Sequence, residues 1–518
     1  MRALALGLLL TACTHRVDAE LSHLAGTEFI LARLTVAPDA PVKVHLTVPR
    51  GFLPPGRSTV VLTFFSMSPE FVTRQLREQV GGKRQPLAVE RVFDGSGDLE
   101  LDYELVLPMS ETQTHEGLVT SSFVSGQSVH LTGSNVLPFL SLKNGEPLRR
   151  PGAVIVDSPG RVVSSLPREG DRFVVDDWTK LRAATFQTGS FSEVLSPLGT
   201  RFVSPDLEPR HLEHLARLES RAEPLLNGWL GSRQRLRLVT THRVPDPSGF
   251  FFDGMQWEES IVTRGPNHPS DVVWDRPNLV LLHELVHAHL PPAPGLPPWI
   301  VEGVTDYFAL RAAMTLAQLP EARIRPAVER AHDRLSRYQS GQSVPYQAGL
   351  VLGYCIDVRL RHDGTTLASV LTRANVRAGG RAIANSYWEE EIALASAAAG
   401  ALVLNAKTDP VLDPADCFVE AGLPESPPLT LEERQVAKRR AGAWLGSLLS
   451  GHMLGLVYAD LEPGKPQAPW RDGDLLLTVD GHAVDTLREV TRAVAGAKPG
   501  PITVEVVRAG DRVHLSVP

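Results

Sequence analysis

The stretch Leu281-Leu282-His283-Glu284-Leu285-Val286-His287 decides how the middle of this chain is expected to fold. A proline near the start suits the first helical turn, and the pattern from Pro277 to Leu290 predicts one helix. Residues four apart in a helix lie one turn apart on the same face, so His283 and His287 come together. Two imidazoles in this register, with Glu284 beside the first, are typical of a zinc site.

The residues around the two histidines favour a metal site over a purely structural helix. The flanking positions are apolar, which predicts that the helix is largely buried; they are Leu279, Val280, Leu281, Leu282 and Leu285. The alternative is a helix whose two histidines are satisfied by ordinary hydrogen bonds. Burying two imidazoles and a carboxylate without partners is costly, and a shared ion compensates for that cost.

Two histidines do not complete a zinc site. Zinc takes about four ligands, and a catalytic site leaves one of them to water, so a third protein ligand is required. Glu302 is the candidate, because a proline-rich turn can fold the next predicted helix, Pro298–Leu316, back onto the first. Asp306 lies one turn beyond Glu302, where its carboxylate can accept from the outer ring nitrogen of His283 or His287.

Four segments together resemble the glycyl aminopeptidase family, a group of PDZ-containing zinc metallopeptidases of the glutamate-ligand (gluzincin) class. The zinc motif, followed by Trp299-Ile300-Val301-Glu302-Gly303-Val304-Thr305-Asp306-Tyr307-Phe308, is similar to the family's metal-binding region. Three further segments resemble its transition-state tyrosine segment, its substrate-binding strand and its N-terminal domain; they are Ser343–Gly349, Asp253–Ser260 and Ser128–Ser134.

This resemblance implies a role for each position. Glu284 would activate a zinc-bound water for attack on a peptide bond, and Tyr346 would stabilise the oxyanion that forms. Gly254, Met255 and Gln256 would bind the substrate. Gln256 stands where the family's strand usually carries a glutamate, whose charge holds the α-ammonium group of a substrate more strongly than an amide does. Aminopeptidase and endopeptidase activity therefore both remain open, with Glu258 or Glu259 as substitutes for the missing charge.

Two other functions are compatible with the same residues. One is a catalytically altered zincin that serves as a PDZ-bearing peptide-binding protein. The other is a zinc hydrolase of non-peptide bonds. The complete set of His283, Glu284, His287, Glu302 and Tyr346 favours an active peptidase over the first of these, because a decayed enzyme has no reason to keep all five.

The last part of the chain resembles a PDZ domain, which we place at residues 441–518. The segment Arg471–Gly481 is close to the PDZ core, and strands are predicted at Leu475–Val479 and Ile502–Arg508. An apolar stripe at helical spacing from Leu487 to Val494 predicts a helix between them. PDZ domains take an extended peptide, often a C-terminus, as an added strand, so a peptide partner is expected.

The N-terminus is typical of an exported lipoprotein. Arg2 and the apolar run Ala3–Leu10 form a segment much shorter than the roughly 20 residues of a membrane-spanning helix, as in a signal peptide. The run ends in Leu10-Thr11-Ala12-Cys13, which resembles the bacterial lipobox. Residues 1–12 would be removed and Cys13 lipidated, and Thr14 favours the periplasmic face of the outer membrane. The lipid would act as a membrane anchor.

The remaining organisation is multidomain. With 518 residues, 43% of them hydrophobic and 21% charged, the chain has room for roughly three to four globular domains. We expect a tether at 13–25, an all-β sandwich-like domain at 26–165, an α+β zincin domain at 166–428 and a linker at 429–440. The net charge of −7 and the lack of a basic stripe argue against a nucleic-acid partner.

Period-two alternation of apolar and polar residues predicts strands in the N-terminal half. They are Val42–Val48, Thr59–Phe65, Leu99–Leu107 and Arg235–Thr241. Further helices are predicted over 320–338 and 346–361. Within the second, Cys355 is expected in the core, and its pairing with Cys417 stays open. His268, His289 and His362 have no partner at ligand spacing and are expected to be surface or satisfied residues.

Overall fold

A computed structural model describes most of the chain after residue 27. The described residues are 28–64, 76–80, 83–108, 122–231, 235–243, 253–265, 276–290, 299–319, 324–335, 345–378, 385–406, 413–423, 430–445, 448–450, 457–459, 474–484, 487–508 and 511–517. The chain forms two compact units, one of Met1–Leu212 with Arg235–Asn267 and the other of Glu213–Gln234 with His268–Pro518. The signal segment, Cys13 and His268 lie outside the described residues.

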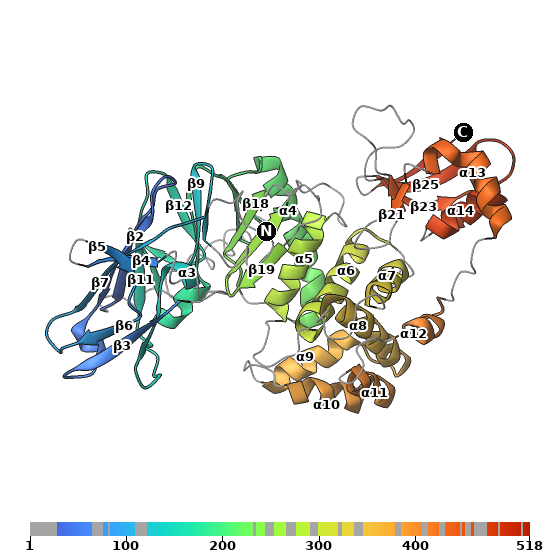
Figure 1. Cartoon of the computed structure of the whole chain (residues 1–518). Helices are drawn as coiled ribbons and strands as arrows, with labels where there is room; N and C mark the ends of the chain where they lie inside the picture. The colour runs from blue at the N-terminus through green and yellow to red at the C-terminus, as the bar shows by residue number, and fades with distance from the viewer. Residues whose placement is uncertain are drawn as a thin grey trace, which may run out of the picture. The chain divides into compact units, whose positions relative to one another are not determined.

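The first unit begins with a β-rich region (Figure 1). Its largest sheet has eight strands in the order β13-β14-β11-β1-β2-β7-β4-β5. In chain order these are β1 Ile30–Thr35, β2 Val42–Val48, β4 Leu76–Val80, β5 Lys83–Pro86, β7 Leu99–Leu105, β11 Gly152–Asp157, β13 Arg168–Glu169 and β14 Arg172–Val175. Strands β2 and β7 confirm two predicted strands, and both alternate buried and exposed residues along their length.

Two smaller sheets complete this region, in the orders β10-β3-β6 and β12-β15-β9-β8. Their strands are β3 Ser58–Thr63, β6 Glu90–Phe93, β8 Phe123–Ser125, β9 Ser128–Thr132, β10 Phe139–Leu142, β12 Arg161–Ser164 and β15 Thr185–Gly189, with the short helices η1 Arg50–Phe52, α3 Gly133–Val136 and η3 Trp178–Ala183. Strand β3 confirms the strand predicted at Thr59–Phe65.

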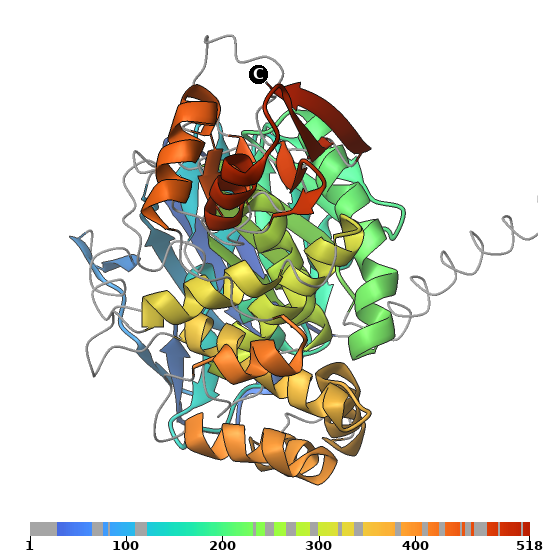
Figure 2. The ribbon, with the colours of Figure 1, turned by 90° about the vertical axis from the view of Figure 1, so that its right-hand side faces the viewer.

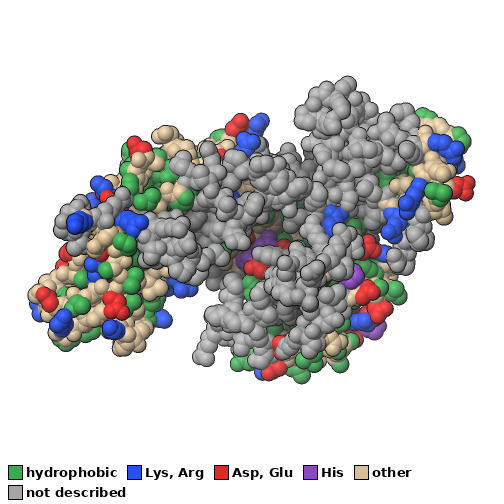
Figure 3. Space-filling model, viewed as in Figure 1, with side chains coloured by type: hydrophobic (Ala, Val, Ile, Leu, Met, Phe, Trp, Pro, Cys, Tyr) green, Lys and Arg blue, Asp and Glu red, His purple; other side chains and the backbone are tan. Residues whose placement is uncertain are grey.

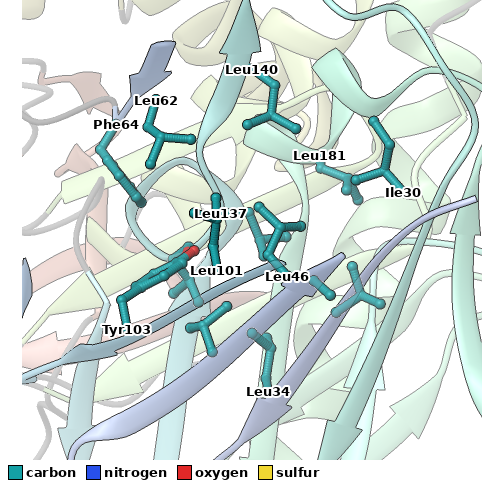
Figure 4. Packing of buried hydrophobic residues seen from close by; sticks show 14 of the residues in the cluster. Ile30, Leu34, Leu46, Leu62, Phe64, Leu101, Tyr103, Leu137, Leu140 and Leu181 are labelled. Carbon is teal, nitrogen blue, oxygen red and sulfur yellow. The ribbon is translucent and has the colours of Figure 1, made fainter. Parts of the chain in front are cut away.

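One apolar core joins the inward residues of these sheets, and Figure 4 shows part of it. Phe64 and Tyr103 meet edge to face with ring centroids 5.8 Å apart. The Tyr103 hydroxyl donates to the Val136 carbonyl at 2.7 Å, so its one polar atom is satisfied inside the core.

A five-stranded sheet follows within the same unit, in the order β16-β17-β18-β20-β19. Its strands are β16 Ser192–Leu195, β17 Arg201–Ser204, β18 Leu238–Arg243, β19 Asp253–Trp257 and β20 Ser260–Gly265. Strand β18 begins three residues later than the predicted strand at 235–241. His242 of β18 lies in the interior against His130 of β9, with ring centroids 4.8 Å apart, and Arg264 of β20 is buried beside them.

The second unit is mainly helical (Figures 1 and 2). Its helices are α5 Arg276–His289, the π-helical segment η4 Trp299–Val304, α6 Thr305–Leu316, α7 Arg325–Leu335, α8 Pro345–His362, α9 Leu367–Ala378, α10 Asn385–Ala395, α11 Ala397–Ala406 and α12 Ala415–Glu420. Helix α4, Pro209–Leu230, leads into this unit. The predicted helices at 277–290, 298–316 and 346–361 are confirmed where the chain is described, and α7 confirms the one predicted at 320–338 over residues 325–335. No helix in the described ranges has the length and apolar character needed to cross a membrane.

A disulfide and an ion pair join helix α12 to helix α8. Cys355 is fully buried, as predicted, and forms a disulfide with Cys417 across a separation of 62 residues. Arg359 of α8 pairs with Glu420 of α12. The disulfide answers the question of pairing that the sequence left open.

The C-terminal part holds a six-stranded sheet in the order β21-β22-β23-β25-β26, with β24 paired to β23. Its elements are α13 Leu431–Leu445, β21 Leu448–Ser450, β22 Val457–Ala459, β23 Leu475–Val479, β24 His482–Ala483, α14 Leu487–Gly496, β25 Ile502–Arg508 and β26 Asp511–Val517. Strands β23 and β25 and helix α14 confirm the predicted elements.

The expected linker at 429–440 is wrong, because most of it belongs to helix α13. Thr430 and Glu433 form a capping box: Glu433 N donates to Thr430 Oγ1 at 3.1 Å, and Thr430 N donates to Glu433 Oε2 at 2.7 Å. Ala437 is buried in the same core as α14, and Arg492 of α14 pairs with Glu433 at 3.1 Å. The charged residues of this segment therefore cover the exposed side of a packed helix.

Candidate metal centre

Helix α5 presents the zinc motif from a buried position. Leu281, Leu282, Leu285 and Val286 are at most 1% exposed, so they pack this helix into the helical unit. Both ends of α5 are joined to α4 or to the residue after it. Near the start, His214 Nε2 and Asn278 Oδ1 lie 3.2 Å apart; at the end, His289 Nδ1 donates to the Gly231 carbonyl at 2.6 Å. His289 is thus buried with its Nδ1 hydrogen-bonded, and its Nε2 lies 3.6 Å from Glu223 Oε2.

Three donor atoms of the predicted ligands converge. His283 Nε2 lies 3.0 Å from His287 Nε2 and 3.2 Å from Glu302 Oε2, and His287 Nε2 lies 3.5 Å from the same oxygen. A tetrahedral zinc ion with bonds of about 2.0–2.1 Å holds its donors about 3.3–3.4 Å apart. The triangle therefore has the size of one face of a zinc tetrahedron, so the donor set fits zinc. Within the described residues this is the one group of three or more His, Cys, Asp or Glu side chains that converge in this way.

Glu302 reaches the histidines from the π-helical segment η4, which leads directly into α6. Short π-helical turns inside helices often mark functional sites. This turn lies against helix α8 through two glycines: a Cβ added to Gly303 would lie only 2.2 Å from the Cα of Gly349. A side chain at position 303 would therefore force the turn with Glu302 away from α8.

The outer nitrogen of each histidine has a partner from the start of α6. His283 Nδ1 lies 2.7 Å from Asp306 Oδ1, so the predicted carboxylate contact is made with His283. His287 Nδ1 lies 3.5 Å from Thr305 Oγ1. Thr305 is not among the residues predicted for the site. Its spacing, three residues after Glu302 and so on the same helical face, was the available signal.

The local charges favour a cation between the three donors. Burial alone would raise the pKa of Glu302, but the hydrogen bond with His283 and the charge of that ring outweigh burial and lower it, so the carboxylate is ionised. Burial opposes protonation of both histidines. The Asp306 carboxylate overcomes this at His283 and raises its pKa. At His287, burial and the neighbouring charge of His283 keep the pKa lowered in spite of Glu302.

The two predicted catalytic residues, Glu284 and Tyr346, lie on helices α5 and α8. Glu284 is only 3% exposed on α5, and its charge contributes to the raised pKa of His283. Tyr346 is the second residue of α8. It precedes Gly349 by three residues, and Gly349 is the residue that contacts the η4 turn.

The predicted substrate-binding residues Gly254, Met255 and Gln256 lie on β19, at the edge of the five-stranded sheet of the other unit. The Gln256 side-chain amide donates to the Glu258 carbonyl at 2.7 Å. Glu259 is paired with Arg237, with 2.5 Å between Oε2 and Nε. Of the two acidic residues considered as substitutes for a charge at position 256, Glu259 is therefore already neutralised.

Comparison with known proteins gives structural likeness only. No protein-family model matches the chain, and no curated protein sequence matches it. Among solved structures, an aminopeptidase N family protein from Idiomarina loihiensis is similar, with a TM-score of 0.48, 14% identity and coverage of 94% of this chain and 95% of that one.

Two further solved structures are similar at lower scores. The M1 zinc metallopeptidase from Deinococcus radiodurans has a TM-score of 0.44 and 16% identity, covering 78% of this chain and 96% of its own. Yeast LTA4 hydrolase has a TM-score of 0.44 and 11% identity, covering 82% and 72%. Likeness at this level of identity and TM-score assigns no family to this chain.

Proposed function

We propose that this protein is a zinc-dependent peptidase. The observation that carries the proposal is the triangle formed by His283 Nε2, His287 Nε2 and Glu302 Oε2, with sides of 3.0, 3.2 and 3.5 Å. Three protein ligands of this type leave one position of a tetrahedral ion for water or substrate, as in catalytic rather than structural zinc sites.

The zinc ligands and Glu284 have separate roles in the proposed reaction. His283, His287 and Glu302 would hold the zinc ion, which when bound polarises the scissile carbonyl and lowers the pKa of water. Glu284 takes the proton from the attacking water and then delivers it to the leaving amine. Its position on α5 directly after His283 and its burial keep its carboxylate close to the reacting atoms and away from bulk solvent.

Tyr346 is proposed to donate a hydrogen bond to the developing oxyanion. Support comes from the position in the chain, since Tyr346 precedes Gly349 by three residues, and Gly349 lies against Gly303 in the turn that holds Glu302. A donor aimed at the oxyanion is commonly worth about 10²–10³ in kcat. Tyr346→Phe should therefore lower kcat by that order and leave the zinc content unchanged.

Strand β19 is proposed to bind the substrate backbone. In the described part of the chain β19 is the last strand of its sheet, and an extended peptide can add to the edge of a sheet. Gln256 is neutral, and its amide N–H donates to the Glu258 carbonyl. An ammonium group can donate to its side-chain oxygen, but it gains no ion pair there, as it would from a glutamate. Matched peptides with free and acetylated N-termini distinguish the two activities: cleavage of both indicates an endopeptidase, and cleavage of free N-termini alone indicates an aminopeptidase.

The proposal is tested by measuring zinc and turnover together. Glu284→Gln should keep one zinc per chain and lose nearly all cleavage of a peptide library, whereas Glu302→Ala should lose zinc. Glu390→Gln is the control, because Glu390 is a half-exposed carboxylate on α10 that pairs with Arg377. A zinc-loaded wild type that cuts no peptide favours a hydrolase of other bonds, and a zinc-free wild type that binds peptides favours a binding protein.

The cellular placement is also a proposal. We infer an exported protein whose Cys13 is lipidated at a bacterial membrane, on the periplasmic side of the outer membrane. The buried Cys355–Cys417 disulfide supports export, since disulfides persist in oxidising compartments. Incorporation of a labelled fatty acid that Cys13→Ser abolishes would support the anchor, and incorporation that survives the substitution would contradict it.

The C-terminal sheet with helix α14 is proposed to be a PDZ-like module that binds peptide C-termini from substrates or partners. The order of strands β23 to β26 with α14 between them supports this assignment. Binding of C-terminal peptides that is lost when their carboxylate is amidated is the expected result, and equal binding of amidated peptides contradicts it.

A further inference from the structure

The two zinc-motif histidines have different partners at their outer nitrogens. His283 Nδ1 meets a carboxylate, Asp306, at 2.7 Å. His287 Nδ1 meets a hydroxyl, that of Thr305, at 3.5 Å. Thr305 is 2% exposed and is the first residue of α6, so water has little access to this contact.

The direction of the Thr305 hydrogen bonds follows from the number of hydrogens available. The Thr305 hydroxyl donates its single hydrogen to the Val301 carbonyl at 2.6 Å. Its oxygen is therefore left to accept from His287. Consequently Nδ1 of His287 carries the hydrogen, and the lone pair of this ring is on Nε2, the atom that faces His283 and Glu302.

The same hydroxyl joins the two elements that supply the donors. Val301 immediately precedes Glu302 in the η4 turn, and His287 lies on α5. Thr305 thus links the second histidine to the backbone that carries the third ligand. A hydroxyl at this place orients the ring without adding a second negative charge beside the one from Asp306.

We propose that Thr305 is a positioning residue for metal binding, which fixes the tautomer and the ring orientation of His287. This inference rests on the proposed zinc site. Outer partners of metal-ligating histidines typically contribute 10–100-fold to metal affinity. Thr305→Val keeps the shape of the side chain but leaves the Nδ1 hydrogen of His287 without its acceptor.

The test is the zinc dissociation constant of the full chain, measured by competition with a chromophoric chelator at fixed pH. Thr305→Val should raise it about 10–100-fold, and Thr305→Ser should restore it to within about threefold of wild type. Thr315→Val is the matched control, since Thr315 on the same helix donates to the Arg311 carbonyl at 2.9 Å and is exposed. It should leave zinc affinity unchanged.

The cobalt-substituted protein supplies a second readout. Its visible d–d bands report ligand geometry, and they should shift in Thr305→Val but not in Thr315→Val. If Thr305→Val does not fold, Thr305→Ala replaces it with the same expectation. Wild-type zinc affinity and an unshifted spectrum in the folded variant would overturn the proposal. A wild type that binds zinc yet cuts no peptide would refute the proposed function alone, because the affinity comparison would still stand.

Discussion

Replacing Gly303 with alanine should separate the zinc ligand Glu302 from its partners. A Cβ at position 303 would lie 2.2 Å from Gly349 Cα, 2.6 Å from its carbonyl carbon and 2.8 Å from its nitrogen. All three atoms are backbone, so no side chain can rotate away. Relief requires the η4 turn and helix α8 to move apart.

The size of that movement follows from the contact distances. Non-bonded carbon atoms settle at about 3.5–4.0 Å, so the 2.2 Å contact must lengthen by at least about 1.3 Å. Zinc sites tolerate deviations of only about 0.2 Å in their bond lengths. Because Glu302 is adjacent to Gly303, we expect zinc affinity to fall by at least tenfold and stability to fall by about 3 kcal/mol, the upper range for overpacking.

Gly353→Ala is the control on the same interface. A Cβ at Gly353 would meet Tyr307 Cβ at 3.4 Å and Val304 Cγ2 at 3.7 Å, which are ordinary contacts. Alanine in mid-helix is favoured over glycine by about 0.5–1 kcal/mol, so this variant should be as stable as wild type or slightly more so. The prediction is tested by measuring the zinc affinity and the urea unfolding midpoint of both variants. A Gly303→Ala protein with the affinity and unfolding midpoint of wild type would show that the two backbones do not meet.

Two further predictions concern other parts of the chain. The Cys355–Cys417 bond closes a loop of 62 residues, so a Cys355→Ser, Cys417→Ser protein should lose about 4 kcal/mol in urea unfolding; equal midpoints would contradict this. Burial and the charge of Arg264 lower the pKa of His130 from 6.5 to about 3. The unfolded chain therefore binds a proton that the folded chain does not between these values, and stability should fall by about 1.4 kcal/mol per pH unit as the pH drops through this window. Burial lowers the pKa of the neighbouring His242 as well, so that residue adds a slope of its own. His130→Gln should therefore remove about 1.4 kcal/mol per pH unit from the total slope of urea unfolding below pH 6.5, and an unchanged slope would exclude His130 as a source.

The parts of the site that the sequence predicted are those set by local geometry. His283 and His287 are related by one turn of a single helix, and Glu302 and Asp306 by one turn of the next. The proline-rich turn between these helices was enough to suggest that they fold together. Neither the π-helical form of η4 nor its contact with α8 follows from such spacing, because both depend on how three helices pack.

Two other features of the fold were not predicted from the sequence, each for a different reason. His130, His242 and Arg264 come from three separate strands, so only the fold shows that they share one interior. These three residues are buried, whereas the charged side chains that Figure 3 shows over the β-rich part are on the surface, with acidic and basic groups interspersed. Helix α13 has a signal in the sequence, because the capping pair Thr430 and Glu433 stands at the correct spacing. The charged composition that follows is typical of a linker as well as of an exposed helix, and composition alone does not distinguish the two.

Helix α6 explains how a site assembled from two helices is held rigid. Its first turn faces α5 through Thr305 and Asp306, each of which contacts one zinc-motif histidine. The next residue, Tyr307, turns the other way and donates to the buried carboxylate of Asp357 on α8 at 2.5 Å. Asp357 also accepts from Arg311 at 3.1 Å, so α6 is fastened to α8 at two successive turns. The metal site is therefore positioned by hydrogen bonds on one side of α6 and by a buried charge pair on the other. Consequently, a change on the α8 side that shifts α6 should weaken zinc binding without touching any ligand.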